Sequence, residues 1–146
     1  GYDFSMVAVY SYRVELASHL GIPELAEPAE AALRLAEERG VLLSVGWPFL
    51  VPRVRGLAAT LAGRLDEAER HFDRALDVAC GAALVPEGAR ARLDAAKMLL
   101  RRGRAGDAAR AERLLAEAIP ALDRYGMVHF ASEARCLAER GSSSLP

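Results

Sequence analysis

The stretch that decides the fold is residues 63–77, which read Gly-Arg-Leu-Asp-Glu-Ala-Glu-Arg-His-Phe-Asp-Arg-Ala-Leu-Asp. Ala68, Phe72 and Ala75 stand at positions i, i+4 and i+7, which places them on one face of an α-helix. Small residues at both ends of that face let a neighbouring helix approach closely, and the large apolar residue fills the space between them. The stretch therefore predicts a helix packed tightly against another helix.

The same spacing of small and large apolar residues recurs twice more. The recurrences are Ala29, Leu33 and Ala36, and Ala111, Leu115 and Ala118. Glycines that we expect to end a helix, or to open a further unit, lie at positions 21, 63, 103 and 141, spaced 42, 40 and 38 residues apart. A period near forty residues indicates stacked helix–turn–helix units. We expect an all-α, right-handed helical-hairpin solenoid with hairpins at about 4–40, 49–81 and 86–126 and an extra helix at 127–140.

One domain is expected over residues 1–141, with a frayed tail at 142–146. Residues 41–48 form an apolar run that is typical of a strand or a buried linker. Because no partner strand is predicted, we expect a loop or one turn of helix, with Trp47 covering the joint between two units. Asp66 and Asp107 precede helical patterns and are expected to cap them at the N-terminus. On the first helix we expect a buried stripe, formed by Met6, Val7, Tyr10, Val14 and Ala17.

The composition of the chain argues against some functional classes of protein. Of the 146 residues, 52% are hydrophobic and the net charge is −1, which argues against a dedicated nucleic-acid binder with a basic face. No apolar run approaches the roughly 20 residues of a membrane helix, so no membrane partner is expected. Arginine far outnumbers the single lysine, Lys97, which we interpret as the codon bias of a GC-rich bacterial genome. Cys80 and Cys136 are expected to be reduced thiols of a cytoplasmic protein. The start at Gly1 rather than methionine suggests a piece of a longer polypeptide.

Residues 63–77, together with Gly56, resemble the middle of a tetratricopeptide repeat. Gly56, Ala68 and Ala75 occupy the three small positions of that family, and Phe72 occupies the large position between the alanines. The other hairpins depart from the pattern, because they carry about three extra residues after the turn glycine and Val14 replaces the small residue of the first helix. Their period also exceeds the usual 34 or so residues of the family.

These departures resemble a particular group of proteins. Residues 99–107, Leu-Leu-Arg-Arg-Gly-Arg-Ala-Gly-Asp, followed by the alanine pattern of 111–118, are similar to the C-terminal repeat region of large bacterial regulators. Those proteins join an AAA-type nucleotide-binding module to class III nucleotide-cyclase domains or to LuxR-type DNA-binding domains. The resemblance implies a non-catalytic protein-interaction module of a cytoplasmic signalling or transcription-regulatory protein. Its partner would be a protein, a peptide or another domain of the parent chain.

No enzyme chemistry is indicated. The turn from Gly103 to Gly106 lacks the lysine and serine or threonine of a phosphate-binding loop. His19, His71 and His129 form no paired set at metal-ligand spacing, so no metal and no cofactor is expected. Acidic residues fall in surface patterns rather than in a catalytic pair.

In tetratricopeptide arrays the first helix of each hairpin lines a concave groove, and the resemblance therefore predicts a set of groove residues. They are Tyr12, Glu15 and His19 from the first hairpin, Arg53, Leu57 and Thr60 from the second, and Asp94, Lys97 and Arg101 from the third. Arg53 and Arg101 are expected to anchor anionic groups, because a guanidinium binds a carboxylate through two parallel hydrogen bonds. The alternative is that these side chains are simply solvated.

The sequence is also compatible with two further functions. A groove of this kind suits a small effector as well as a peptide, so the chain is alternatively a sensor domain. The third possibility is a self-association segment. A solenoid end exposes apolar faces, so a homo-oligomer is expected to form through Met127–Leu137 or through Phe4–Tyr10.

Overall fold

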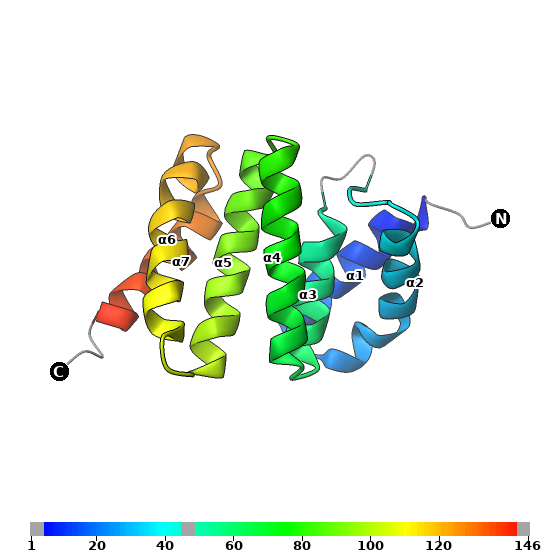
Figure 1. Ribbon diagram of the computed structural model, residues 1–146, viewed down its shortest axis with the longest axis horizontal. Coiled ribbons are helices and arrows are strands. Elements are labelled where there is room, and N and C mark those ends of the chain that lie inside the picture. Colours follow the sequence, from blue (N-terminus) through cyan, green and yellow to red (C-terminus); the bar gives the residue numbers. More distant parts are fainter. Residues whose placement is uncertain (1–4, 45–48, 143–146) are drawn as a thin grey trace. The chain divides into compact units, whose positions relative to one another are not determined.

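The computed structural model describes residues 5–44 and 49–142, with side chains described up to residue 141. These residues form seven α-helices and one short 3-10 helix, η1 (Figure 1). The elements are α1 (Met6–Leu20), η1 (Pro23–Leu25), α2 (Glu27–Glu38), α3 (Val51–Leu61), α4 (Leu65–Gly81), α5 (Val85–Arg102), α6 (Asp107–Arg124) and α7 (Val128–Ser142). Among the described residues the extended pairing is limited to one isolated antiparallel bridge, between Leu43 and Leu50. The all-α prediction is therefore confirmed.

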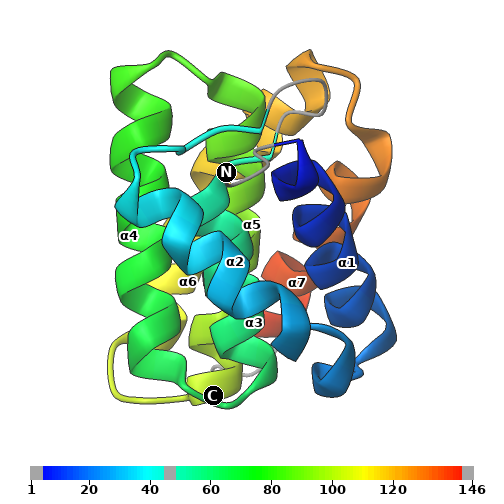
Figure 2. The same ribbon diagram turned by 90° about the vertical axis from the view of Figure 1, so that its right-hand side faces the viewer.

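The chain divides into two compact units, residues 1–78 and residues 79–146, with the boundary in the last turn of α4. In unit 1, α1 packs against α2 and α3, and α2 packs against α3 (Figure 2). In unit 2, α5 packs against α6, and α7 packs against both of them. Helical-hairpin packing is thus present within each unit, whereas the right-handed solenoid and the single domain over 1–141 stay predictions.

The repeated alanine pattern forms the core of the helices that carry it. In each of the three copies the large apolar residue is at most 2% exposed and the flanking alanines at most 1%. These residues are Ala29, Leu33 and Ala36 in α2, Ala68, Phe72 and Ala75 in α4, and Ala111, Leu115 and Ala118 in α6. Alanine at both ends of the face brings the neighbouring helix close, which is the packing that the sequence predicts.

One such close approach joins α3 to α4 in unit 1. A Cβ atom added at Gly56 would lie 2.7 Å from Cε1 of the Phe72 ring, well inside van der Waals contact. The absence of a side chain at Gly56 therefore lets the ring lie directly against the backbone of α3. This contact agrees with the positions that the tetratricopeptide resemblance assigns to the two residues.

Most helix ends share one backbone motif. Hydrogen bonds from the N–H of residues 22, 41, 64, 84 and 127 to the carbonyl five residues earlier close these ends, as in the Schellman motif. The residue just before each of these donors has a positive φ, and four of the five are glycines. The exception is Ala83, with a φ of 54°. The expectation for Gly141 is corrected, because this glycine lies inside α7 and ends no helix.

Several expected helix starts are displaced by one or more residues. The second helix does not begin at Pro23, because η1 intervenes and Pro28 stands in the first turn of α2. Proline is tolerated there because the first turn needs no amide donor. Asp66 lies within the first turn of α4 and Asp107 is the first residue of α6, so neither is the N-cap residue.

The expected buried stripe of α1 is correct only in part. Val7, Val14 and Ala17 are buried as expected, and Ser11 is buried with them. Met6 is exposed at the edge of the face that packs on α2 and α3, and Tyr10 is half-buried. On α7, Ala134 lies within the segment Met127–Leu137 that was expected to associate, but it is wholly buried.

The connection between α2 and α3 is extended rather than helical at both ends of its described part. The Val51 amide donates to the Leu42 carbonyl, and the Ser44 amide donates to the Phe49 carbonyl. No strand forms in the described residues here, in agreement with the loop prediction. The expected role of Trp47 lies outside the described residues.

Candidate functional site

The predicted groove residues belong to two different units. Those on α1 and α3 lie in unit 1, and those on α5, namely Asp94, Lys97 and Arg101, lie in unit 2. Convergence of all of them on one face stays a prediction.

Arg53 and Glu15 meet across α3 and α1 and form an ion pair. The guanidinium group of Arg53 is wholly buried, and the Glu15 side chain is 22% exposed. The expectation that Arg53 anchors an anionic ligand is not met, because its charge faces a carboxylate of its own unit and is closed to solvent. The pair joins two helices instead.

The remaining predicted groove residues of unit 1 differ in exposure. Tyr12 and His19 are exposed on α1. Thr60 is half-buried, and its hydroxyl donates to the Gly56 carbonyl one turn earlier, at 2.8 Å. This local bond satisfies the hydroxyl within its own helix. Leu57 is buried and belongs to the core.

In unit 2 the predicted residues also have intramolecular neighbours. The Nζ atom of Lys97 lies 2.6 Å from Oε1 of Glu133, which ties α5 to α7. Arg101 is exposed, and Asp94 is half-buried. The charged side chain of Lys97 therefore serves a helix–helix contact in addition to any role toward a ligand.

A polar pocket of about 390 Å³ lies in unit 1, and sequence analysis did not find it. Its walls come from α2, α3, the turn before α4 and the first turn of α4. The lining residues are Glu27, Glu30, Ala31, Arg34, Arg55, Arg64 and Glu67. We call this the charged pocket. Three guanidinium groups and three carboxylates converge on it, which gives it both signs of charge at short range.

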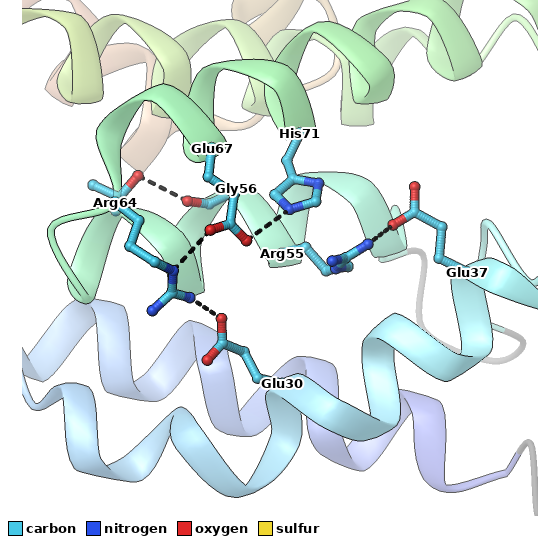
Figure 3. A network of polar contacts seen from close by, with 8 residues as sticks. Glu30, Glu37, Arg55, Gly56, Arg64, Glu67 and His71 are labelled. Atoms are coloured by element: carbon cyan, nitrogen blue, oxygen red, sulfur yellow. Dashed lines mark hydrogen bonds and ion pairs between the residues drawn. The ribbon is translucent and has the colours of Figure 1, made fainter.

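Two of these arginines are held in place by carboxylates (Figure 3). Arg64 lies between α2 and α4, where it forms an ion pair with Glu30 and donates from Nε to Oε2 of Glu67 at 2.8 Å. Arg55 donates from Nη1 to Oε2 of Glu37 at 2.5 Å. These two arginines are thereby held in place before any ligand arrives.

His71 extends this network on α4. Its Nε2 atom lies 3.4 Å from Oε1 of Glu67. Burial lowers the pKa of His71 and the nearby Arg55 charge lowers it further, which together outweigh the hydrogen bond to Glu67 and the charges of Glu67 and Glu37. The imidazole of His71 is therefore neutral at pH 7, and it lies beside the carboxylate of Glu67.

Glu67 itself stays ionised. Burial raises the pKa of its carboxyl group, but the hydrogen bonds of Arg64 and His71, and the charges that both carry in the acidic range where Glu67 titrates, outweigh burial, so the pKa lies below its ordinary value. Glu67 therefore holds a full negative charge at the rim of the charged pocket. That charge orients Arg64.

Arg34 differs from the other two arginines of the pocket. It is exposed on α2, and among the described residues its guanidinium has no hydrogen-bond or ion-pair partner. Glu30 and Arg34 are four residues apart on one face of α2, so both point to the same side of the helix. Arg34 therefore offers a complete planar fork at the mouth of the pocket.

A second hollow, of about 270 Å³, lies in unit 2 and has a different character. Its lining consists mainly of alanine, leucine and glycine, with Glu112 as its only charged member among the described residues. A site that recognises a ligand needs a few polar groups that fix its orientation. The charged pocket of unit 1 meets this requirement, and the hollow of unit 2 does not.

Sequence analysis missed the charged pocket because its partners are distant along the chain. Arg64 and Glu30 are 34 residues apart, and Arg55 and Glu37 are 18 apart. The local pattern around Glu67 was interpreted as helix-surface charge, which accounts for the pair with Arg64 but not for the link to α2. The signal that the sequence does hold is the position of Arg64 directly after the turn glycine, where the end of α3 meets the start of α4.

The described residues bear on two other kinds of site. No group of three or more histidine, cysteine or acidic side chains among them is arranged to hold a metal ion. Cys80 and Cys136 are exposed free thiols. Within the described helices none is both long and apolar enough to cross a membrane.

Comparisons with known proteins return no relative. No family model matches the chain, and neither a curated protein nor a solved structure matches it.

Proposed function

We propose that this chain is a non-catalytic helical interaction module that captures a partner protein or peptide through the charged pocket of unit 1. The observation that carries the proposal is the set of guanidinium groups at the pocket, of which Arg55 and Arg64 are fixed by carboxylates and Arg34 is left open. A partner segment with a carboxylate would be bound by Arg34 through two parallel hydrogen bonds.

Preorganisation supports this role. Binding normally costs about 0.5–1.5 kcal/mol for each long side chain that becomes ordered. Arg64 and Arg55 are already ordered by Glu30, Glu67 and Glu37, so this part of the cost is met in the free protein. The pocket would therefore bind a charged segment with less loss of side-chain entropy than an ordinary arginine cluster.

The resemblance of residues 99–118 to repeat regions of bacterial regulators supports a place for this module inside a larger cytoplasmic signalling or transcription-regulatory protein. In such a protein the captured partner would be another protein or a domain of the same chain. The module would report that binding to domains elsewhere.

A second candidate is a sensor of a small effector. The volume of about 390 Å³ falls within the roughly 300–1,000 Å³ of ligand pockets. Three carboxylates beside three guanidinium groups favour an effector with both an anionic and a cationic group.

A selection experiment separates the proposed function from its alternatives. Random 12-residue peptides displayed on phage would be selected on the wild-type chain, and the enriched peptides would be titrated against Arg34→Ala and Arg34→Lys. We expect enriched peptides to contain acidic residues and to lose about 10- to 100-fold in affinity with Arg34→Ala, as one charge-assisted pair requires. Arg34→Lys should recover only part of that loss.

The matched control is Arg113→Ala, which removes another exposed helix arginine that lies in unit 2. It should leave peptide affinity unchanged. Enriched peptides that bind equally to Arg34→Ala would refute the proposal. Thermal stabilisation of the chain by free zwitterionic amino acids, with no peptide enriched, would select the effector alternative.

A further inference from the structure

The first helix carries an apolar stripe on its solvent side. Six of the ten exposed large hydrophobic side chains in the described residues lie between positions 6 and 22. They are Met6, Val9, Tyr12, Leu16, Leu20 and Ile22, with exposed fractions from 37% to 61%. We call the five on α1 together with Ile22 the α1 stripe.

The spacing of these residues makes the stripe continuous. Met6, Val9 and Tyr12 are three residues apart, and Leu16 and Leu20 follow at intervals of four. At 3.6 residues per turn, these five side chains fall within about one third of the helix circumference. They form a band of roughly 22 Å along α1, at about 1.5 Å per residue.

The opposite face of α1 is already occupied. Val7, Ser11, Val14 and Ala17 are buried, and α1 packs on α2 and α3. The helix is therefore apolar on two sides, which is typical of a helix that is covered on both. Unit 1 covers one of these sides.

We propose that the α1 stripe is the interface of a two-fold symmetric dimer, in which α1 of one copy packs antiparallel against α1 of a second copy. The stripe suits this arrangement because its large side chains are apolar over the whole length of α1, with Arg13 as the charged residue within the same third of the helix circumference. With the axis near Tyr12, Met6 of one copy would face the region of Leu20 in the other, and Val9 would face Leu16. These two contacts pair apolar with apolar, and the same patch serves both copies, as in an isologous interface.

The area available agrees with a dimer. Large side chains have on the order of 200 Å² each, so the exposed fractions of the stripe correspond to roughly 500 Å² per copy. Two copies would bury roughly 1,000 Å² together, which is at the lower limit for a specific interface. The same burial corresponds to a reversible association rather than an obligate one.

Antiparallel packing also agrees with electrostatics. It sets the N-terminal end of one helix dipole beside the C-terminal end of the other. In the described part of α1 the charged side chains are Arg13 and Glu15. Glu15 is directed to Arg53, and Arg13 donates from Nε to the Leu25 carbonyl at 2.6 Å. Glu15 therefore points away from the stripe, and Arg13, which lies within it, is tied back to the end of η1.

The test is the mass of the whole chain in solution as a function of concentration, measured by sedimentation velocity. We expect the wild-type chain to pass from monomer to dimer in the micromolar range. Leu16→Glu and, separately, Val9→Glu should weaken association at least about 100-fold, because each would bury a carboxylate in an apolar contact. Circular dichroism should show unchanged helicity, since both positions are exposed in the monomer.

The control variant is Val128→Glu, which adds the same charge at an exposed apolar position of α7 and should leave the dimer intact. Disulfide cross-linking tests whether the two α1 helices lie next to each other in the dimer. In a chain with Cys80→Ser and Cys136→Ser, the substitution Tyr12→Cys should give a covalent dimer on mild oxidation. A wild-type chain that stays monomeric up to millimolar concentration would overturn the proposal. A dimer that survives Leu16→Glu but is lost with Val128→Glu would do so too, and would assign the interface to α7.

Discussion

Both units join their helices through solvated ion pairs, such as Arg64 with Glu30 in unit 1, but unit 1 adds pairs between helices that are largely buried. In unit 1 the pair of Arg53 and Glu15 has one wholly buried partner, and the pair of Arg55 and Glu37 is at most 18% exposed on either side. In unit 2 the pairs between helices are largely solvated, as between Lys97 and Glu133. The least exposed ion pairs of unit 2 in the described residues are instead local, between Arg102 and Asp107 and between Arg90 and Glu87.

The two units are therefore stabilised by different interactions. A buried pair between helices contributes to which helices meet, because removing one partner leaves an uncompensated charge. Exposed pairs contribute little, because water and salt screen them. We therefore expect unit 1 to depend on specific long-range charges, and unit 2 to depend on its alanine and leucine faces and on its turns.

The largest expected effect comes from breaking the buried pair of unit 1. Glu15→Gln removes the carboxylate but keeps the size of the side chain, and it leaves the Arg53 guanidinium buried without this counter-charge. We expect a loss of about 3 kcal/mol in the free energy of unfolding, measured by urea denaturation.

The matched control in unit 2 is Glu133→Gln, which removes the carboxylate from the solvated pair with Lys97. It should cost less than about 1 kcal/mol. Equal losses in the two variants would show that burial of the ion pair does not distinguish the units.

The second expected effect concerns glycines in the first helix of a hairpin. Gly56→Ala in unit 1 would place a methyl group 2.7 Å from the Phe72 ring, and the ring is held in the core. We expect a net loss of about 1–3 kcal/mol by thermal denaturation, because overpacking outweighs the better helix propensity of alanine.

Gly88→Ala in unit 2 gives the corresponding comparison. Its added methyl would lie 3.2 Å from Cβ of Ala79 and 3.3 Å from Nη1 of Arg92, and the second of these is the end of a flexible side chain. We expect a change of less than about 1 kcal/mol, because the gain in helix propensity offsets a mild clash. A larger loss at Gly88 than at Gly56 would contradict the contact assigned to the Phe72 ring.

These contacts also show what the sequence contains. The alanine faces and the contact of Gly56 with Phe72 were predictable. Helical periodicity indicates which side of a helix is buried, and small residues on that side indicate where another helix approaches closely. The turn glycines at 21, 40, 63, 103 and 126 were predictable for a similar reason, since a positive φ favours glycine.

The charged pocket and the buried Arg53 were not predictable in the same way. An arginine on a helix has the same local pattern whether it meets water or a carboxylate 38 residues away, as Arg53 does with Glu15. The α1 stripe was missed for another reason. Apolar residues occur all around α1, so periodicity alone does not select the side that packs on α2 and α3, and Met6 was assigned to the wrong one.

The third prediction concerns the local pair of unit 2. The hydrogen bond from Arg102 holds the pKa of Asp107 at about 2, below its ordinary 3.8. Burial raises this pKa, but the hydrogen bond from the Arg104 amide and the charges of both arginines lower it further. A carboxyl group whose pKa is lower in the folded state stabilises that state fully above its unfolded pKa. This contribution is lost as the pH falls from about 4 through about 2.

Asp107→Asn removes that titration. We expect the melting temperature of the wild-type chain to exceed that of the variant at pH 6, and the difference to shrink steadily below pH 4. Comparing the two chains at each pH cancels the other carboxylates. A difference that stays constant from pH 6 to pH 2.5 would mean that the Arg102 contact does not depend on the Asp107 charge.

The smallest expected effect distinguishes the helix ends of the two units. Gly63 closes α3 in unit 1 with a φ of 76°, whereas Ala83 stands at the equivalent point after α4 in unit 2 with a φ of 54°. A residue with a Cβ atom pays about 1–2 kcal/mol in this conformation, and glycine loses about 0.4–1 kcal/mol more in unfolded-state entropy. Ala83 is exposed, so no packing is lost when its methyl group is removed. Ala83→Gly should therefore raise the free energy of unfolding by about 0.5 kcal/mol, and Gly63→Ala should lower it by a similar or larger amount. Chemical denaturation of both variants measures the two changes, and a loss of stability in Ala83→Gly would show that the left-handed end of α4 carries no strain.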